Sequence, residues 1–420
     1  MHKIPNKHHH IKPMPHQYYQ LKNGIKLIHK EVSSPISHFG ILINAGTRDE
    51  ENDKTGIAHF VEHTIFKGTT KRKGYQIIRR MEDVGGDLNA STSKEETYFH
   101  TSFLSEDYSR AVELLSDILF QATFPEKELE KEKDVVYEEI KYYRDTPSEL
   151  IFDDFEALVY NEHPLGRSIL GTHKSVKQIK KQDILHFIQN NYTLGNIVLS
   201  SVGNISASKL LSLCERFFGE QPLVTSPRER KPFTTYTPAT KITHKNTSQT
   251  HVMLGTLAYS FHDEPKNTFL LLTNLLGGQG MNTRLNMTIR EKLGLAYTVE
   301  ASYSPFSDSG LFNIYIGCDN STWERCIDLT YKELHKLKQQ KLGTMQLHYA
   351  KKQFLGQLAI SNEAKLNEML AMGRTLLFFE EVETLEELIA QIDAITADNI
   401  LQVANEVFNQ ELFSLLIFTK

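Results

Sequence analysis

Short runs of apolar, β-branched residues predict strands near the start of the chain, and stretches with a helical pattern follow them. Turn residues bound each run, so the elements can be assigned one by one. The first half is predicted to contain strands at 25–32 and 37–46, helices at 55–66 and 74–84, two strands within 86–103, and helices at 105–120 and 126–144.

The second half repeats this order of elements. Its predicted elements are strands at 250–260, 295–304 and 310–318, with helices at 267–278, 322–340 and 344–361. A repeated order indicates an ancient duplication. Because strands and helices mix without regular βαβ alternation, we predict the α+β class, with two similar domains that are each an antiparallel sheet packed with helices.

A segment rich in proline, threonine and charge lies near the middle of the chain and lacks periodicity, so it is predicted to be a linker. A length of 420 residues also favours two domains over a single core. The predicted divisions are a flexible tail (1–17), an N-terminal domain (18–221), the linker (222–240) and a C-terminal domain (241–420).

Composition narrows the class of protein. The net charge is -5 and no basic stripe occurs, so we expect neither nucleic-acid nor membrane binding. The N-terminus lacks the apolar run of a signal peptide, and no stretch approaches the ~20 apolar residues of a membrane span. Three cysteines without paired spacing are expected to be buried thiols, typical of a reducing compartment. A cytoplasmic location is therefore expected.

The strongest chemical signal is the pentapeptide from His59 to His63. Residues four apart share one face of a helix, so His59 and His63 can bind one metal ion, and Glu62 lies on the same side. The other positions of this helix are apolar, which predicts a buried helix with one polar patch. Buried imidazoles and a carboxylate need a partner, and zinc accepts both ligand types.

The helix predicted at 126–144 offers a third ligand. At 100° per residue, Glu132 and Glu139 lie ~20° apart, at the edge of the apolar stripe, whereas Glu138 lies on roughly the opposite side. The alternative is a solvated charged helix whose phasing is coincidental. Two histidines, one carboxylate and one open position form a catalytic type of zinc site, in which Glu62 could take the proton of the metal-activated water as general base.

These residues carry a resemblance to a known family. The motif His-x-x-Glu-His is the inverted zincin pattern, and the sequence resembles the pitrilysin/insulinase zinc peptidases, in particular their short, mitochondrial-processing-peptidase-like branch, from about Tyr18 to the C-terminus. The segments GGDLNASTSKEETYFH, PSEL, HPLGRSILGT and REKLGLAY also match. The resemblance implies one Zn²⁺ per chain in the N-terminal, catalytic domain, bound by His59, His63 and Glu139, with Glu132 just outside the ligands.

The resemblance also implies substrate contacts. The strand that carries Asn89 and Ala90 would pair with the backbone of an extended peptide; without the resemblance, these two residues would be assigned to an ordinary strand. Arg290 and Tyr297 would act in catalysis, at the site of the partner subunit in a homodimer that encloses a chamber. The second half lacks the metal motif, so its domain is expected to bind no metal.

The predicted function is a zinc-dependent endopeptidase that hydrolyses peptides or unfolded segments. Two alternatives remain open at this level, namely a non-catalytic scaffold subunit and a maturation peptidase dedicated to one partner peptide. Manganese or cobalt could replace zinc, because metal availability matters as much as affinity.

Overall fold

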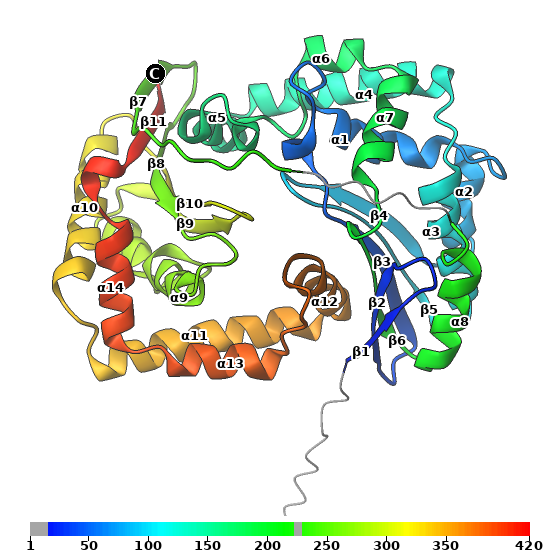
Figure 1. Ribbon diagram of the computed structural model, residues 1–420. Helices are drawn as coiled ribbons and strands as arrows, with labels where there is room; N and C mark the ends of the chain where they lie inside the picture. The colour runs from blue at the N-terminus through cyan, green and yellow to red at the C-terminus, as the bar shows by residue number, and fades with distance from the viewer. Residues whose placement is uncertain (1–15, 222–228) are drawn as a thin grey trace, which may run out of the picture.

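The computed structural model describes residues 16–221 and 229–420, which form two halves with one sheet each (Figure 1). Most of the predicted tail and residues 222–228 of the predicted linker lie outside the described residues. Residues 229–239 of the predicted linker contain no helix or strand, and its last residue, Thr240, begins the first strand of the C-terminal half. The chain therefore passes from one half to the other in an extended, irregular segment.

The N-terminal half begins with three strands, and the metal-motif helix follows them. Its strands are β1 (Gln17–Gln20), β2 (Lys26–Glu31), β3 (Ile36–Ile43), β4 (Asp87–Thr92), β5 (Thr97–Leu104) and β6 (Ile197–Gly203). Its helices are α1 (Ile57–Thr64), α2 (Gly74–Glu82), α3 (Tyr108–Gln121), α4 (Glu126–Asp145), α5 (Pro147–Tyr160), α6 (His173–Gln178), α7 (Lys181–Asn191) and α8 (Ala207–Phe217).

The C-terminal half repeats the scheme with fewer strands. Its strands are β7 (Thr240–His244), β8 (Thr250–Ala258), β9 (Ala296–Pro305), β10 (Gly310–Cys318) and β11 (Ser414–Thr419). Its helices are α9 (Lys266–Gly277), α10 (Trp323–Gln339), α11 (Thr344–Glu363), α12 (Lys365–Phe379), α13 (Leu385–Ala394) and α14 (Ala397–Val407), and a π-helical turn spans Asn286–Glu291.

The two sheets share one topology. The strand order is β1-β2-β6-β3-β5-β4 in the first and β7-β11-β8-β10-β9 in the second, so the orders coincide once β1 is set aside. This supports the predicted repeat and the α+β class. Each sheet is antiparallel except for one parallel pairing, β2 with β6 and β7 with β11, so the sheets are mixed. The sequence did not predict these parallel pairs, because β6 and β11 return to the sheet after long helical stretches.

The halves exchange one helix each. Helix α12 of the C-terminal half packs on β3 and β6, where Met369 and Leu376 join Ile28, Leu42 and Val198 in one apolar cluster. Helix α5 of the N-terminal half packs in the same way on β8 and β11 of the other sheet. Figure 1 shows both helices between the two sheets. Each sheet is therefore completed by the opposite half.

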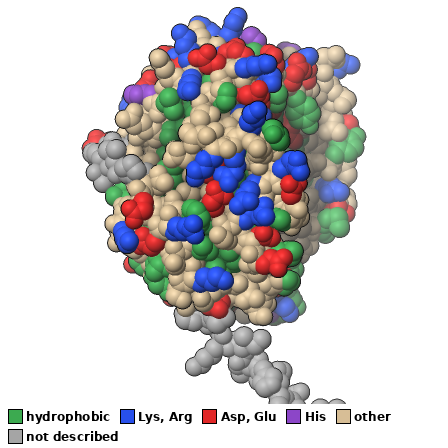
Figure 2. All heavy atoms as spheres, turned by 90° about the vertical axis from the view of Figure 1, so that its right-hand side faces the viewer, with side chains coloured by type: hydrophobic (Ala, Val, Ile, Leu, Met, Phe, Trp, Pro, Cys, Tyr) green, Lys and Arg blue, Asp and Glu red, His purple; other side chains and the backbone are tan. Residues whose placement is uncertain are grey.

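The outer surface of the N-terminal half carries acidic and basic side chains interspersed with apolar ones (Figure 2). Within the described ranges, no helix has both the length and the apolar character that a membrane crossing requires. The three cysteines, Cys214, Cys318 and Cys326, are buried and free of disulfide bonds, as predicted.

Candidate metal centre

Helix α1 is held in place by its apolar side chains. Phe60 and Val61 are fully buried in the core of the N-terminal half, and Ile57 is 2% exposed. The helix starts after Gly56, which has a φ of 88°, a left-handed conformation that favours glycine. The prediction of a buried helix with one polar patch is confirmed. His59, Glu62 and His63 form this polar patch.

Helix α4 runs beside α1 and has the predicted phase. Its apolar residues Leu129, Val136 and Ile140 enter the core. Glu132 is buried, Glu139 is half-buried, and the side chain of Glu138 is 77% exposed. Because the core fixes the rotation of the helix, two carboxylates of this charge-rich element face α1 while most of the others face water.

His59, His63 and Glu139 converge on one point. The Nε2 atoms of His59 and His63 lie 3.7 and 3.6 Å from the same carboxylate oxygen, Oε2 of Glu139. The ligand atoms of the three residues all lie within 4.8 Å of one another, and no other such group of three occurs in the described part of the chain. The structure therefore brings together the three residues that sequence reasoning selected as ligands.

The two imidazoles have different electrostatic surroundings. Burial lowers the pKa of His59 to about 3, and the neighbouring His63 adds to this effect. Burial acts in the same direction on His63, but the hydrogen bond to Glu132 and the charge of Glu139 outweigh it and raise the pKa. His59 is thus a neutral imidazole, the form that coordinates metals.

Glu132 fixes the orientation of His63. The ring donates a hydrogen bond from Nδ1 to Oε1 of Glu132 over 3.0 Å, which directs Nε2 toward Glu139. The ammonium group of Lys67 lies 2.6 Å from the other oxygen of Glu132. Burial opposes ionisation of Glu132, but His63 and Lys67 prevail and lower the pKa. Carboxylates in this position hold a metal-binding histidine in one tautomer. Sequence reasoning missed Lys67, because nothing in its spacing relates it to Glu132.

Glu62 lies on the same helix, within reach of the cluster. Burial raises its pKa, and Thr92 and His63 oppose the rise. Thr92 is the last residue of β4 and is itself buried. Thr92 is the second residue that the sequence did not single out, although it lies two positions after Ala90 on the predicted substrate-contacting strand. The carboxylate of Glu62 thus lies between α1 and the end of β4.

Strand β4 is the edge strand of its sheet and packs beside α1. Asn89 and Ala90 pair with His100 and Phe99 of β5 on one side only. Among the described residues, no strand pairs with the other edge of β4. An edge strand presents N–H and C=O groups that can accept another extended chain.

Arg290 and Tyr297 lie in the other half. Arg290 is in the π-helical turn, and Tyr297 is in β9. Tyr297 is 56% exposed, and its hydroxyl donates to Asp319 over 3.1 Å. Figure 1 places β9 and α1 in opposite halves. Within the described residues of this single chain, no hydrogen bond or ion pair links either residue to His59, His63 or Glu139. The structure therefore does not bring these two residues to the site of their own chain.

Comparisons with known families agree on one group of proteins. Residues 27–173 match the family described as insulinase, peptidase family M16, and residues 178–354 match the "peptidase M16 inactive domain". The first match contains His59, Glu62, His63 and Glu139. The second contains Arg290 and Tyr297.

Individual relatives cover nearly the whole chain. A Bacillus subtilis protein named "Uncharacterized zinc protease YmxG" is 32% identical over 95% of this chain and 97% of its own length. A Rickettsia felis protein named "Uncharacterized zinc protease" is 33% identical, with coverage of 95% and 96%. A solved structure from Pseudomonas fluorescens, described as a peptidase M16 inactive domain, has the same fold, with a TM-score of 0.90 at 20% identity over 97% of this chain and 98% of that one.

Proposed function

The chain belongs to the insulinase family of peptidases, family M16, and from this premise we propose that it is a zinc-dependent endopeptidase. Its substrates are peptides or unfolded segments, bound in extended form within an enclosed chamber. The observation that carries the proposal is the convergence of His59, His63 and Glu139 beside Glu62. The zinc-protease names of the Bacillus and Rickettsia relatives support the choice of metal and of reaction.

The donor set fits one zinc ion. Two ligand atoms at ~2.0–2.1 Å from a tetrahedral zinc lie ~3.3 Å apart, and the two histidine nitrogens lie 3.7 and 3.6 Å from the Glu139 oxygen. Two neutral nitrogens and one carboxylate oxygen leave a coordination position open, as in catalytic zinc sites. When bound, zinc supplies Lewis acidity, which polarises a peptide carbonyl and lowers the pKa of water to about 7.

Glu62 is the general base of the proposed reaction. It accepts a proton from the attacking water and later donates it to the nitrogen of the leaving amine. Burial raises the pKa of this carboxyl group, which makes it a better proton acceptor than an exposed glutamate. Thr92 opposes the rise.

The open edge of β4 supports the proposed mode of substrate binding. A peptide that adds to this edge forms main-chain hydrogen bonds beside Asn89 and Ala90, and such bonds place little demand on its sequence. Because Thr92 ends the same strand and lies beside Glu62, a peptide paired along β4 passes the general base.

We also propose a homodimer in which Arg290 and Tyr297 act at the partner's metal site. Both residues are exposed, and within the described residues neither forms a hydrogen bond or ion pair with the cluster of its own chain, which supports this arrangement. A guanidinium and a phenol stabilise the oxyanion that forms when water attacks a carbonyl.

Mixing two inactive variants tests the shared site. Glu62→Gln lacks the base, whereas Arg290→Ala/Tyr297→Phe lacks the donated pair. If the pair acts across the dimer, each mixed dimer has one complete site, so random exchange of subunits restores about a quarter of the wild-type rate. The measurement is cleavage of a quenched fluorescent peptide after subunit exchange. A mixture that stays as inactive as its two components would show that the pair does not act in trans.

Bound metal and its effect on cleavage test the activity itself. His8, His9 and His10 are consecutive and could themselves bind metal, so they are first replaced by serine. The resulting protein should contain about one zinc per chain by mass spectrometry. It should also cleave a quenched peptide, lose this activity to a chelator and regain it with zinc. A protein that holds no metal and cleaves no peptide would contradict the proposal and favour a non-catalytic scaffold subunit.

A further inference from the structure

The turn between β4 and β5 is fixed by the ion pairs of its three charged residues. Its three charged residues, Lys94, Glu95 and Glu96, are 5%, 4% and 6% exposed. Lys94 pairs with Glu156 of α5 over 2.7 Å, and Glu96 accepts from Arg374 of α12 over 2.9 Å. Both α5 and α12 are the exchanged helices, so the turn lies where the two halves meet.

Glu95, the middle residue of this turn, belongs to a buried ionic network that crosses between the halves. Arg48 has a side chain only 1% exposed and donates to Glu95 over 2.7 Å. The same guanidinium donates to both carboxylate oxygens of Asp308, over 2.7 and 2.6 Å. Ser307 donates its backbone N–H and its hydroxyl to Glu95, over 2.8 and 2.6 Å. Ser307 and Asp308 lie in the turn between β9 and β10 of the C-terminal half.

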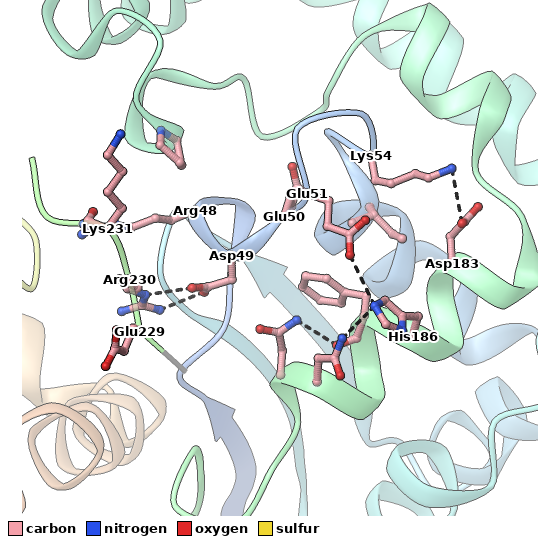
Figure 3. A pocket seen from close by; sticks show the side chains of 15 residues that line it. Arg48, Asp49, Glu50, Glu51, Lys54, Asp183, His186, Glu229, Arg230 and Lys231 are labelled. Atoms are coloured by element: carbon pink, nitrogen blue, oxygen red, sulfur yellow. Dashed lines mark hydrogen bonds and ion pairs between the residues drawn. The ribbon is translucent and has the colours of Figure 1, made fainter. Parts of the chain in front are cut away.

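The segment 46–50 transmits this contact to the metal-motif helix. Its backbone is hydrogen-bonded to the β4–β5 turn, from Arg48 N to Lys94 O over 2.8 Å. Two residues later, the buried carboxylate of Glu50 accepts the N–H groups of Gly56 and Ala58, each over 2.9 Å. These donors begin α1. Figure 3 shows Arg48 extending toward Lys231 of the linker, while Glu50 lies toward α1 along a cavity of about 350 Å³.

We propose that Asp308, in the half that carries no metal motif, is a positioning residue for the metal-binding helix of the other half. Its bond to Arg48 fixes the segment 46–50, and Glu50 then fixes the start of α1, which carries His59, Glu62 and His63. The consequence for catalysis rests on the proposed function. The consequence for α1 itself does not, because the contacts are present without metal or substrate.

Asp308→Asn removes one charge from the network while Arg48 keeps its bond to Glu95. With a weaker hold on segment 46–50, the amides of residues 56–64 should exchange with deuterium about tenfold faster in the zinc-free protein. Zinc should bind about tenfold more weakly in a competition assay with a chromogenic chelator. The value of kcat should fall with KM changed less than twofold, because the substrate edge of β4 remains intact.

Lys30→Met is the matched control. Lys30 of β2 pairs with Glu368 of α12, which is also a contact between the halves, and Glu368 keeps its second partner Lys365. Neither residue touches segment 46–50. This variant should lower the melting temperature to a similar degree and leave the exchange of residues 56–64 and the affinity for zinc unchanged.

Equal exchange rates for residues 56–64 in Asp308→Asn and Lys30→Met would overturn the proposal and reduce Asp308 to an ordinary contact between the halves. Ser307→Ala provides the same comparison if the first variant does not fold, because it removes a hydroxyl that donates to Glu95 and accepts from Arg48 over 3.2 Å. Asp308→Glu should restore part of the protection. A wild-type protein that binds no zinc would refute the proposed function, yet the exchange comparison in zinc-free protein would still decide this inference.

Discussion

Replacing Glu62 by glutamine is expected to leave zinc bound and to lower kcat by about 10²- to 10⁴-fold, the contribution of a positioned general base. Glutamine has nearly the same shape as glutamate, so Phe60 and Val61 of α1 should stay packed in the core. Its neutral amide cannot accept the proton of the attacking water. The loss should therefore appear in kcat, with little change in the binding of the peptide.

The experiment combines zinc content by mass spectrometry with steady-state cleavage of a quenched peptide. Glu51→Gln is the matched control, because its side chain is 63% exposed and its only ion pair is with the surface residue His186 among the described contacts. The control should cleave at the wild-type rate. A Glu62→Gln protein that binds zinc and cleaves normally would show that another group accepts the proton.

Replacing Glu139 by glutamine is expected to abolish stable zinc binding and, with it, cleavage. The substitution exchanges an anionic oxygen ligand for a neutral one that binds zinc poorly. Zinc at 100 times its dissociation constant stabilises a folded protein by about 2.7 kcal/mol and thereby raises its melting temperature. In the Glu139→Gln variant, the addition of zinc should no longer raise the melting temperature. In the zinc-free protein the variant should be no less stable than wild type, since burial already disfavours the charge of Glu139 and raises its pKa.

Glu138→Gln is the matched control for this substitution, because it makes the same chemical change at the adjacent residue. Its side chain is 77% exposed and pairs only weakly, with Lys141 over 3.8 Å. Zinc content, melting temperature with and without zinc, and cleavage should all match wild type. If Glu139→Gln also keeps one zinc per chain with unchanged affinity, Glu139 is not a ligand.

Helix phase explains why the sequence selected residues whose side chains converge in the structure. The apolar residues of α1 and α4 fix how each helix turns toward the core, and this alone distinguishes Glu139 from Glu138. The candidate ligands could therefore be selected without knowledge of the distance between the two helices, because each helix presents one face to the other. The same reasoning selected Glu132, which lies about two helical turns before Glu139 on the same face of α4 and can therefore bond to His63.

Helix phase could not predict contacts between segments that are far apart in the sequence. Arg48 and Asp308 are 260 positions apart and meet only because the two sheets pack through exchanged helices. The charged turn from Lys94 to Glu96 resembles a solvated loop in the sequence, yet all three residues are buried. The resemblance to a known family named Arg290 and Tyr297, but a single chain does not place them at a metal site.

The exchange of helices also determines when the N-terminal half can finish folding during synthesis of the chain. The first sheet has all its strands once β6 ends at Gly203, but one apolar face waits for α12, which ends at Phe379. At about 5–20 residues per second, a ribosome needs on the order of ten seconds or more to make the intervening segment. During this interval Ile28, Leu42 and Val198 have no cover from α12. The nascent N-terminal half thus exposes an apolar sheet face until α12 (Lys365–Phe379) has been synthesised.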